Sequence, residues 1–128
     1  LKGCVTEPAV LVQNCDNVTL RNLTITTTPG ARRTVVLEDL HDARVDGLTF
    51  RGEADRAAPG LVYRVVSDEA FAHLQVQGVT ARGGRPAGIL LENTSQGGSL
   101  DHYIITGNFA TVVDRIKGRH SVIRDNLP

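Results

Sequence analysis

A strand–corner–strand motif recurs along this chain, and internal repetition constrains a fold more than any other sequence feature. The motif reads NVTLRNLTI at its first appearance and returns as ARVDGLTF, HLQVQGVTA, YIITGNFA and SVIRDNLP. In each copy an aliphatic residue precedes a corner of Asn, Gly or Asp, which are residues that tolerate a positive φ. The aliphatic positions are Leu20, Val45, Val76, Ile105 and Ile123. One supersecondary unit therefore repeats along the whole chain.

An earlier apolar strand precedes each copy of the motif. These strands lie at residues 9–14, 34–39, 63–68, 87–93 and 110–115. A unit of three short strands cannot bury its apolar side alone, whereas stacked units bury a continuous core. The repeat therefore predicts an all-β fold, a parallel β-helix of about five coils with three short strands per coil. We expect residues 1–128 to form a single domain, either part of a longer β-helix or a subunit of an oligomer.

An antiparallel β-sandwich is the competing architecture, because it also has short strands separated by regular turns. A sandwich does not require one motif to return at a similar period, so the repeat favours the β-helix. Helical periodicity is weak throughout the chain, and only residues 67–74 are expected to hold one helical turn.

Composition argues against several classes of partner. The 14 basic and 14 acidic residues give a formal net charge of zero, so no nucleic acid or anionic membrane partner is indicated. No apolar segment is long enough to cross a bilayer as a helix. Because the chain begins at Leu1, we expect a mature product or a fragment. Cys4 and Cys15 either form a disulfide in a secreted protein or are buried thiols.

The segment VLVQNCDNVTLRNLTI, residues 10–25, resembles the right-handed parallel β-helix proteins of the pectin-lyase-like superfamily. That group includes pectate lyases, polygalacturonase-like glycosidases, fructan-cleaving transferases and phage tailspikes. Its members often carry an Asn ladder at the corner between the second and third strands. Asn22 matches that ladder, and Asn108 and Asn126, one residue later in their copies, can rejoin it. The resemblance implies a right-handed coil, secretion, a polysaccharide or cell-surface glycan as partner, and no cofactor.

Most catalytic motifs of the polygalacturonase-like enzymes are missing from the chain. Those enzymes carry an Asn-Thr-Asp segment, an Asp pair, a Gly-His-Gly and an Arg-Ile-Lys. This chain contains Arg115-Ile116-Lys117 but none of the other three. The resemblance therefore implies a fold that handles polysaccharide, and it leaves hydrolysis, lyase chemistry and binding without cleavage all open.

Alternation along the first strand of each unit predicts which side chains face outward. The residues expected to point inward are Val12, Leu37, Val66, Leu91 and Val113, and those expected to form an outward column are Gln13, Glu38, Ser67, Glu92 and Asp114. Glu38 and Glu92 would then lie two rungs apart, with backbones separated by roughly 9–10 Å, close to the carboxyl separation of inverting glycosidases. Glu92 and Asp114 would be neighbours, as in a retaining pair.

We therefore predict Glu38, Glu92 and Asp114 as catalytic residues. The residues predicted to bind substrate are Gln13, Arg64, Arg115 and Lys117. Gln13 belongs to the outward column, and the three cations lie close enough to it to hold acidic sugars. A solvated face with scattered charges accounts for the same residues without any chemistry, and both interpretations stay open at this level.

A second column contains His73, His102 and His120, each three residues before the core aliphatic of its copy. Asn17 and Asp42 hold that place in the first two copies. Histidines on successive rungs would be neighbours, and histidine is a common metal ligand and general base. We predict no metal site, because ligands need supporting partners, and we keep these three histidines as the candidates for one.

The two ends of a stack of coils expose unpaired backbone groups and apolar side chains, which invite pairing with another chain. Three functions remain open on this basis. The first is a secreted carbohydrate-active enzyme, a glycoside hydrolase or polysaccharide lyase with its groove on the first-strand sheet. The second is a non-enzymatic, trimeric binding module of the tailspike or adhesin type. The third is a structural β-helix that assembles end to end by coil stacking.

Overall fold

The computed structural model describes residues 10–26, 34–51, 59–81 and 88–127, which contain ten strands and no helix. The odd-numbered strands form one sheet and are β1 (Val10–Gln13), β3 (Val35–Glu38), β5 (Leu61–Val65), β7 (Ile89–Asn93) and β9 (Val112–Asp114). The even-numbered strands form the other and are β2 (Thr19–Thr26), β4 (Ala43–Arg51), β6 (Ala70–Thr80), β8 (Ser99–Thr106) and β10 (Val122–Arg124).

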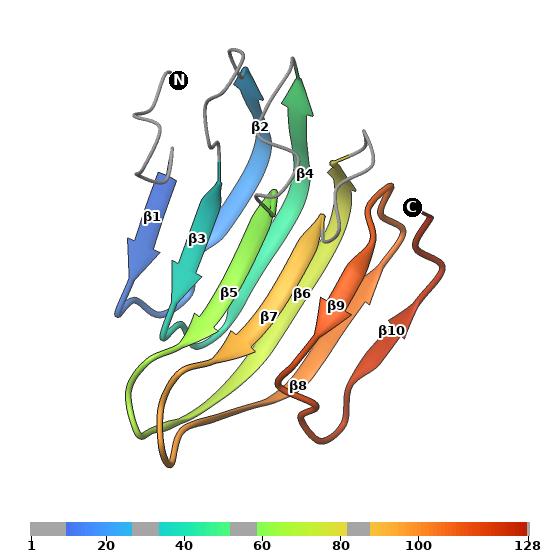
Figure 1. The fold of residues 1–128 in the computed structure, drawn as a ribbon. Helices are drawn as coiled ribbons and strands as arrows, with labels where there is room; N and C mark the ends of the chain where they lie inside the picture. Colours follow the sequence, from blue (N-terminus) through green and yellow to red (C-terminus); the bar gives the residue numbers. More distant parts are fainter. Residues whose placement is uncertain (1–9, 27–33, 52–58, 82–87, 128) are drawn as a thin grey trace.

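Both sheets are parallel, with strand orders β1-β3-β5-β7-β9 and β10-β8-β6-β4-β2. Each strand pairs with the strand two places along the chain, so the chain coils through both sheets from β1 to β10 (Figure 1). Every strand pair among the described residues is parallel, which excludes the antiparallel sandwich. The architecture is a β-solenoid, consistent with the parallel β-helix predicted from the repeat and with the right-handed coil that the resemblance implies.

The solenoid has about three complete turns rather than the five coils predicted. Its last rung is short, since β9 and β10 have three residues each. The coils also have two strands rather than three: a short strand of four or five residues in the first sheet and a long one of eight to eleven in the second, as in β1 to β8. The reason is that β2, β4 and β6 run continuously through the corner that the sequence predicts to separate a second strand from a third.

Two columns of residues with positive φ form the corners of the coil. The second corner contains Asn22, Gly47, Gly78, Gly107 and Asp125, with φ between 52° and 85°. The Asn, Gly and Asp content predicted for this corner is therefore confirmed. A side chain at Gly47 would be strained, because φ there is +85° and the new Cβ would lie 3.1 Å from Oδ1 of Asn22. The first corner contains Asn17, Asp42, His73, His102 and His120, with φ between 55° and 70°.

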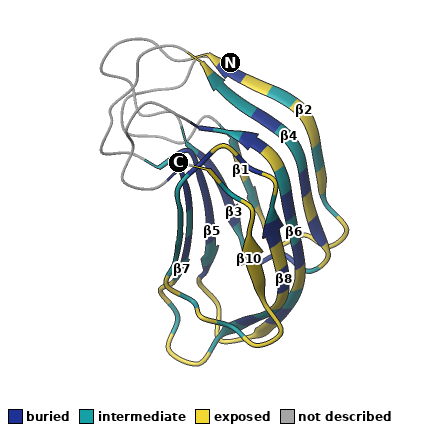
Figure 2. Ribbon diagram, turned by 90° about the vertical axis from the view of Figure 1, so that its right-hand side faces the viewer, coloured by how far each residue is buried: buried dark blue, intermediate teal, exposed yellow. Residues whose placement is uncertain are grey.

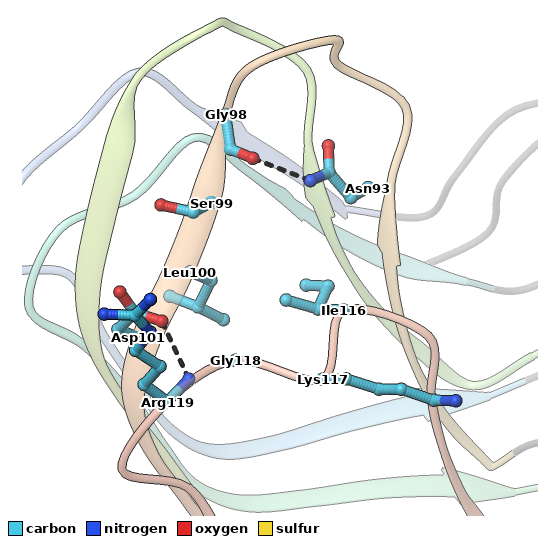
Figure 3. Close-up of a pocket in the computed structure, with 9 residues that line it drawn as sticks. All are labelled: Asn93, Gly98, Ser99, Leu100, Asp101, Ile116, Lys117, Gly118 and Arg119. Atoms are coloured by element: carbon cyan, nitrogen blue, oxygen red, sulfur yellow. Dashed lines mark hydrogen bonds between the residues drawn. The ribbon is translucent and has the colours of Figure 1, made fainter.

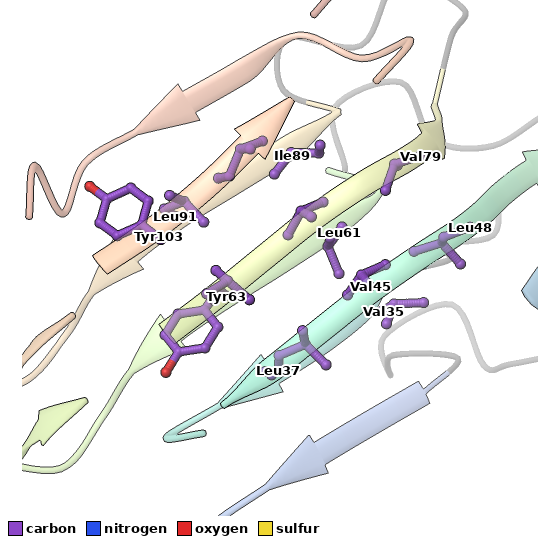
Figure 4. Packing of buried hydrophobic residues seen from close by; sticks show 14 of the residues in the cluster. Val35, Leu37, Val45, Leu48, Leu61, Tyr63, Val79, Ile89, Leu91 and Tyr103 are labelled. Carbon is purple, nitrogen blue, oxygen red and sulfur yellow. The ribbon is translucent and has the colours of Figure 1, made fainter. Parts of the chain in front are cut away.

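The core lies between the two sheets, and buried residues alternate with exposed ones along several of the strands (Figure 2). Leu37, Tyr63 and Leu91 form one inward column, and they pack with buried residues of the second sheet such as Val45 (Figure 4). The inward position predicted for Val66 was wrong, since Val66 is 45% exposed and Tyr63 takes its place. The same prediction was wrong for Val113, because Asp114 is the residue opposite Leu91.

Tyr63 can occupy the core because its hydroxyl is satisfied there. The hydroxyl donates to the Leu40 carbonyl at 2.8 Å and accepts from the Leu40 N–H at 3.1 Å. Burial is the main cause that raises the pKa of Tyr63 to about 12, since an ionised phenol would lose its hydration. The phenol therefore stays protonated and joins the first sheet to the connection that follows β3.

Asn108 and Asn126 form a two-rung amide ladder on the inner side of the coil. Asn108 is 2% exposed; its Oδ1 accepts the Val79 N–H at 2.9 Å, and its Nδ2 donates to Oδ1 of Asn126 at 2.8 Å. Asn126 in turn donates from Nδ2 to the Ile105 carbonyl at 2.9 Å. These two residues lie one position beyond the corner that Asn22 occupies, so they form a separate ladder and do not rejoin its column.

No helical turn forms at residues 67–74. Asp39 is 6% exposed, and its carboxylate accepts the Val66 N–H at 2.8 Å and the Ser67 hydroxyl at 2.7 Å. A buried carboxylate with these partners fixes the chain in an extended connection until β6 begins at Ala70.

Cys15 is a free and exposed thiol that donates to the Gln13 carbonyl at 3.2 Å. Neither state predicted for Cys15, a disulfide or a buried thiol, is therefore present. Cys4 lies outside the described residues.

Replacing Asn108 by alanine should lower the free energy of unfolding by about 2–4 kcal/mol, because the buried Val79 N–H and the Asn126 amide both lose a partner. Urea denaturation measures this change. The control is Asn22→Gly at the exposed corner, which should change stability by less than about 0.5 kcal/mol. Similar losses in the two variants would contradict a structural role for the inner ladder.

Candidate functional site

A column of polar side chains runs along the outer face of the first sheet. Gln13, Glu38, Arg64 and Glu92 are aligned by the strand register. Arg115 follows β9 and continues the column, since its N–H bonds to the Leu91 carbonyl. We call these five residues the charged column. All five are predicted site residues. Ser67 and Asp114, which the sequence placed in the outward column, lie outside it because they are displaced in register.

Arg64 lies between the two glutamates of the charged column. Its Nε is 2.6 Å from Oε1 of Glu92, and its Nη1 is 3.4 Å from Oε1 of Glu38. The two-rung separation predicted for Glu38 and Glu92 is confirmed by the register. An inverting glycosidase needs room for a water between its carboxyl groups. Here a guanidinium bridges them, so the pair is arranged to accept hydrogen bonds rather than to hold that water.

Asp114 faces inward and holds a turn. It stands opposite Leu91 rather than beside Glu92, so the neighbouring pair predicted from the sequence is not formed. Its Oδ2 accepts the Tyr103 hydroxyl at 2.6 Å, and its Oδ1 accepts the N–H groups of Ile116 and Lys117 at 2.9 Å each. Both carboxylate oxygens are therefore engaged by the protein itself.

The chain after Asp114 forms a turn that borders a cavity of about 330 Å³. The cavity is lined by Asn93, Gly98, Ser99, Leu100, Asp101, Ile116, Lys117, Gly118 and Arg119 (Figure 3). The sequence prediction included Lys117 but missed the rest of this cavity. The signal that could have found it is the local density of cations, since three of the five residues 115–119 are Arg or Lys in a chain of zero net charge.

The Arg115-Ile116-Lys117 tripeptide is divided between different surroundings. Arg115 is exposed in the charged column, Ile116 is partly buried and packs on the core, and Lys117 has φ 53° and lines the cavity. The two cations therefore do not act from one strand face. The tripeptide can contribute charge to a bound ligand, with Lys117 at the cavity and Arg115 at the sheet.

His73, His102 and His120 form the stack predicted for successive rungs. The ring centroids of His73 and His102 are 5.3 Å apart, and those of His102 and His120 are 4.4 Å apart with an interplanar angle of 4°. A metal ion binds in the plane of an imidazole, along the nitrogen lone pair. Rings stacked face to face direct their lone pairs side by side rather than toward one point. In the described parts of the chain, no group of three His, Cys, Asp or Glu residues is arranged to hold a metal ion.

Comparison with known proteins finds no relative of the chain. No family model, no curated protein and no solved structure matches the chain. Residues 10–26, 34–51, 59–81 and 88–127 also contain no helix of the length and apolarity that a bilayer crossing requires. The strand register therefore carries the fold assignment, and it defines the class of the protein as a parallel β-solenoid.

Tyr103 links the turn after Asp114 to the core, and its absorbance provides a spectroscopic test of that link. Its hydroxyl donates to Asp114 and accepts the Gly118 N–H at 2.8 Å. Burial first, and then the hydrogen bond to Asp114, raise the pKa of Tyr103 to about 12. A phenol whose pKa is raised by folding stabilises the folded state below pH 10 and loses that contribution as the pH rises toward 12.

The chain has two tyrosines, and the pKa of each is raised to about 12. Ultraviolet absorbance of the phenolate should therefore rise near pH 12 in the folded chain and near pH 10 in urea. Stability should fall across the same interval, less steeply in Tyr103→Phe than in the parent chain. Phenolate formation near pH 10 in the folded chain would show that the hydroxyls are not held as described.

Proposed function

We propose that this chain is an extracellular polysaccharide-binding β-helix of the pectin-lyase-like type, with the glycan lying along the outer face of the first sheet. The observation that carries the proposal is the charged column. It places side chains with hydrogen-bonding groups in register at a rung spacing of about 4.8 Å. A linear polymer of hydroxyl-rich units needs such a row of donors and acceptors along one direction.

The column supplies both kinds of group. The Glu38 and Glu92 carboxylates accept hydrogen bonds from sugar hydroxyls, and each carboxylate has lone pairs beyond the one that Arg64 uses. Gln13 offers a donor and an acceptor, and Arg115 offers donors. Because the strands are hydrogen-bonded in two directions, these groups are held in place before the ligand arrives, which lowers the entropic cost of binding.

Binding without cleavage fits the geometry better than hydrolysis. The Arg64 guanidinium lies where the catalytic water of an inverting enzyme would stand, and Asp114 is committed to its turn. The extracellular location and the superfamily assignment are parts of the same proposal. They are supported by the β-solenoid fold together with the resemblance of residues 10–25.

The test is a screen of soluble polysaccharides by affinity electrophoresis, followed by titration of any ligand found. The double variant Glu38→Gln/Glu92→Gln keeps the size of both side chains and removes both charge-assisted acceptors, so affinity should fall about tenfold or more. The matched control is Asp46→Asn. Asp46 is a similar carboxylate on the outer face of the second sheet, where it pairs with Arg21 and Arg44, and its loss should leave affinity unchanged.

Three outcomes would count against the proposal. If no polysaccharide binds, the function is wrong. If the double variant binds as tightly as the parent chain, the charged column is not the site. If a bound glycan is cut by the parent chain and left intact by the double variant, the chain is a carbohydrate-cleaving enzyme instead.

Self-association is the second candidate, because exposed apolar side chains gather on the last two rungs. Ile104, Phe109, Val122 and Leu127 are between 39% and 58% exposed. Ile104 and Val122 are register partners, as are Phe109 and Leu127. Such an aligned apolar surface suits contact with a second copy of the chain, side by side in a trimer or end to end in a fibre. Sedimentation velocity would show a mass that rises with concentration and falls in Val122→Lys; a monomer at every concentration would remove this candidate.

A further inference from the structure

We propose that the turn at residues 115–119, together with its cavity, is a subsite for a densely sulfated segment of polysaccharide. We call residues 115–119 the cationic turn. The inference rests on the proposed function in taking the ligand to be a polysaccharide. It goes further by assigning a second contact surface, beside the charged column, and by naming the substituent that this surface recognises.

The cationic turn is held rigidly by three side chains from outside it. Asp114 accepts the first two N–H groups, those of Ile116 and Lys117. The Tyr103 hydroxyl accepts the next one, from Gly118. Asp101 accepts the Arg119 N–H at 2.8 Å. Every amide from 116 to 119 therefore has a partner, so the cations project from a fixed backbone.

Close packing beneath the turn adds to this rigidity. A Cβ at Gly118 would lie 1.9 Å from the Leu100 carbonyl oxygen and 2.7 Å from the Tyr103 ring. The backbone of the turn therefore lies directly against β8, at a distance that only glycine permits. A preorganised array of charges loses less freedom on binding than a mobile one.

The cations of the turn lack the ion pairs that arginines elsewhere have. Arg21, Arg44, Arg64 and Arg124 each have a carboxylate oxygen within 4.0 Å. Among the described residues, no such pair involves the three cations of the turn. The nearby carboxylates of Asp101 and Asp114 serve the backbone amides instead. These two carboxylates keep their negative charge, so the three cations leave the turn with a small excess of positive charge on a chain whose net charge is zero.

The cavity separates two of these cations and offers polar groups between them. Lys117 and Arg119 extend toward opposite sides of the cavity, with Leu100 and Ile116 between them (Figure 3). The Ser99 side chain and the Asp101 carboxylate lie on the same surface. An anionic group deep in the cavity would meet Asp101, so the anionic groups belong beside Lys117 and Arg119 and the hydroxyls of the ligand beside Ser99 and Asp101.

Charge density indicates sulfate esters as the anionic groups. The three cations stand on alternate residues, so the backbones of consecutive cations are at most about 7 Å apart, since two residues span no more than that. One sugar unit can carry several sulfate esters, whereas a uronic acid carries a single carboxylate. A sulfate ester also has three terminal oxygens for charge-assisted hydrogen bonds with Lys and Arg. Arg115 belongs to both surfaces, so one glycan can run from the charged column onto the turn.

The experiment compares three polymers with the same backbone: dextran, carboxymethyl dextran and dextran sulfate, each titrated against the 128-residue chain at physiological ionic strength. We expect the affinity order dextran sulfate, carboxymethyl dextran, dextran. Lys117→Asn/Arg119→Gln should weaken binding of dextran sulfate about tenfold or more, and Asn is chosen because it tolerates the positive φ of residue 117. Urea denaturation of each variant checks that the fold is retained.

The matched control is Arg21→Gln/Arg124→Gln, which removes the same amount of charge from two exposed arginines outside the turn. It should bind dextran sulfate within about twofold of the parent chain. The inference fails if both double variants lose affinity equally, which would mean non-specific attraction, or if dextran sulfate binds no better than carboxymethyl dextran. If the dextran sulfate test fails but Glu38→Gln/Glu92→Gln loses glycan binding, the proposed function stands without the subsite. If the dextran sulfate test succeeds but Glu38→Gln/Glu92→Gln binds glycan normally, only the cationic turn is supported as a binding site.

Discussion

Parallel pairing of strands in register is the interaction on which this structure depends. Each interior strand is hydrogen-bonded to the equivalent strand of the coil before and the coil after, so residues far apart in the chain become neighbours at about 4.8 Å. A short repeat that could not fold alone gains a core because its apolar residues are stacked on those of the next copy. The apolar columns, the charged column and the corner columns of residues with positive φ all follow from this one constraint.

Stacking equivalent polar residues brings like charges together or buries polar atoms. The chain avoids these unfavourable contacts in different ways. In the charged column an arginine alternates with glutamates, so like charges are not adjacent. In the core, the Tyr63 hydroxyl is bonded to the backbone of Leu40, in the connection of the preceding coil. At the first corner three imidazoles stack face to face instead. Each of these arrangements involves only a few neighbouring residues, and together they allow polar residues to stack in a repeating fold.

The fold was predictable from the sequence because the repeat is visible in the aliphatic positions and corners. Its register in the first sheet was only partly predictable. Aligning the copies by their paired valines placed Val66 in the core, whereas the structure places Tyr63 there, since the phenol finds partners in the Leu40 backbone. The same alignment placed Asp114 outside, whereas Tyr103 provides the partner that lets this carboxylate face inward. In both cases a polar residue enters the core because a partner waits there, and alternation along one strand does not reveal that partner.

The candidate site was predictable to a lesser degree. Glu38 and Glu92 lie at the separation expected from counting rungs, because β3, β5 and β7 are regular. The arginine between them was assigned to substrate, and its pairing with both carboxylates depends on side-chain contacts that a repeat does not encode. The cavity beside the turn depends on hydrogen bonds that backbone N–H groups donate to Asp101 and Asp114. These bonds are specific to one connection and have no counterpart in the repeat.

The solenoid also determines how the molecule opens. Hydrogen-bonded pairing joins each described strand only to the strands of adjacent rungs, so a terminal rung can detach without breaking the pairing of the rungs beyond the next one. The strand β10 is short, exposed and paired on one side only, so it belongs to the part that frays first, while Tyr103, Asp101 and Asp114 hold the cationic turn before it. A polymer spanning this turn and the charged column would clamp the last rung to the middle of the stack, and amide hydrogen exchange in β10 would slow accordingly.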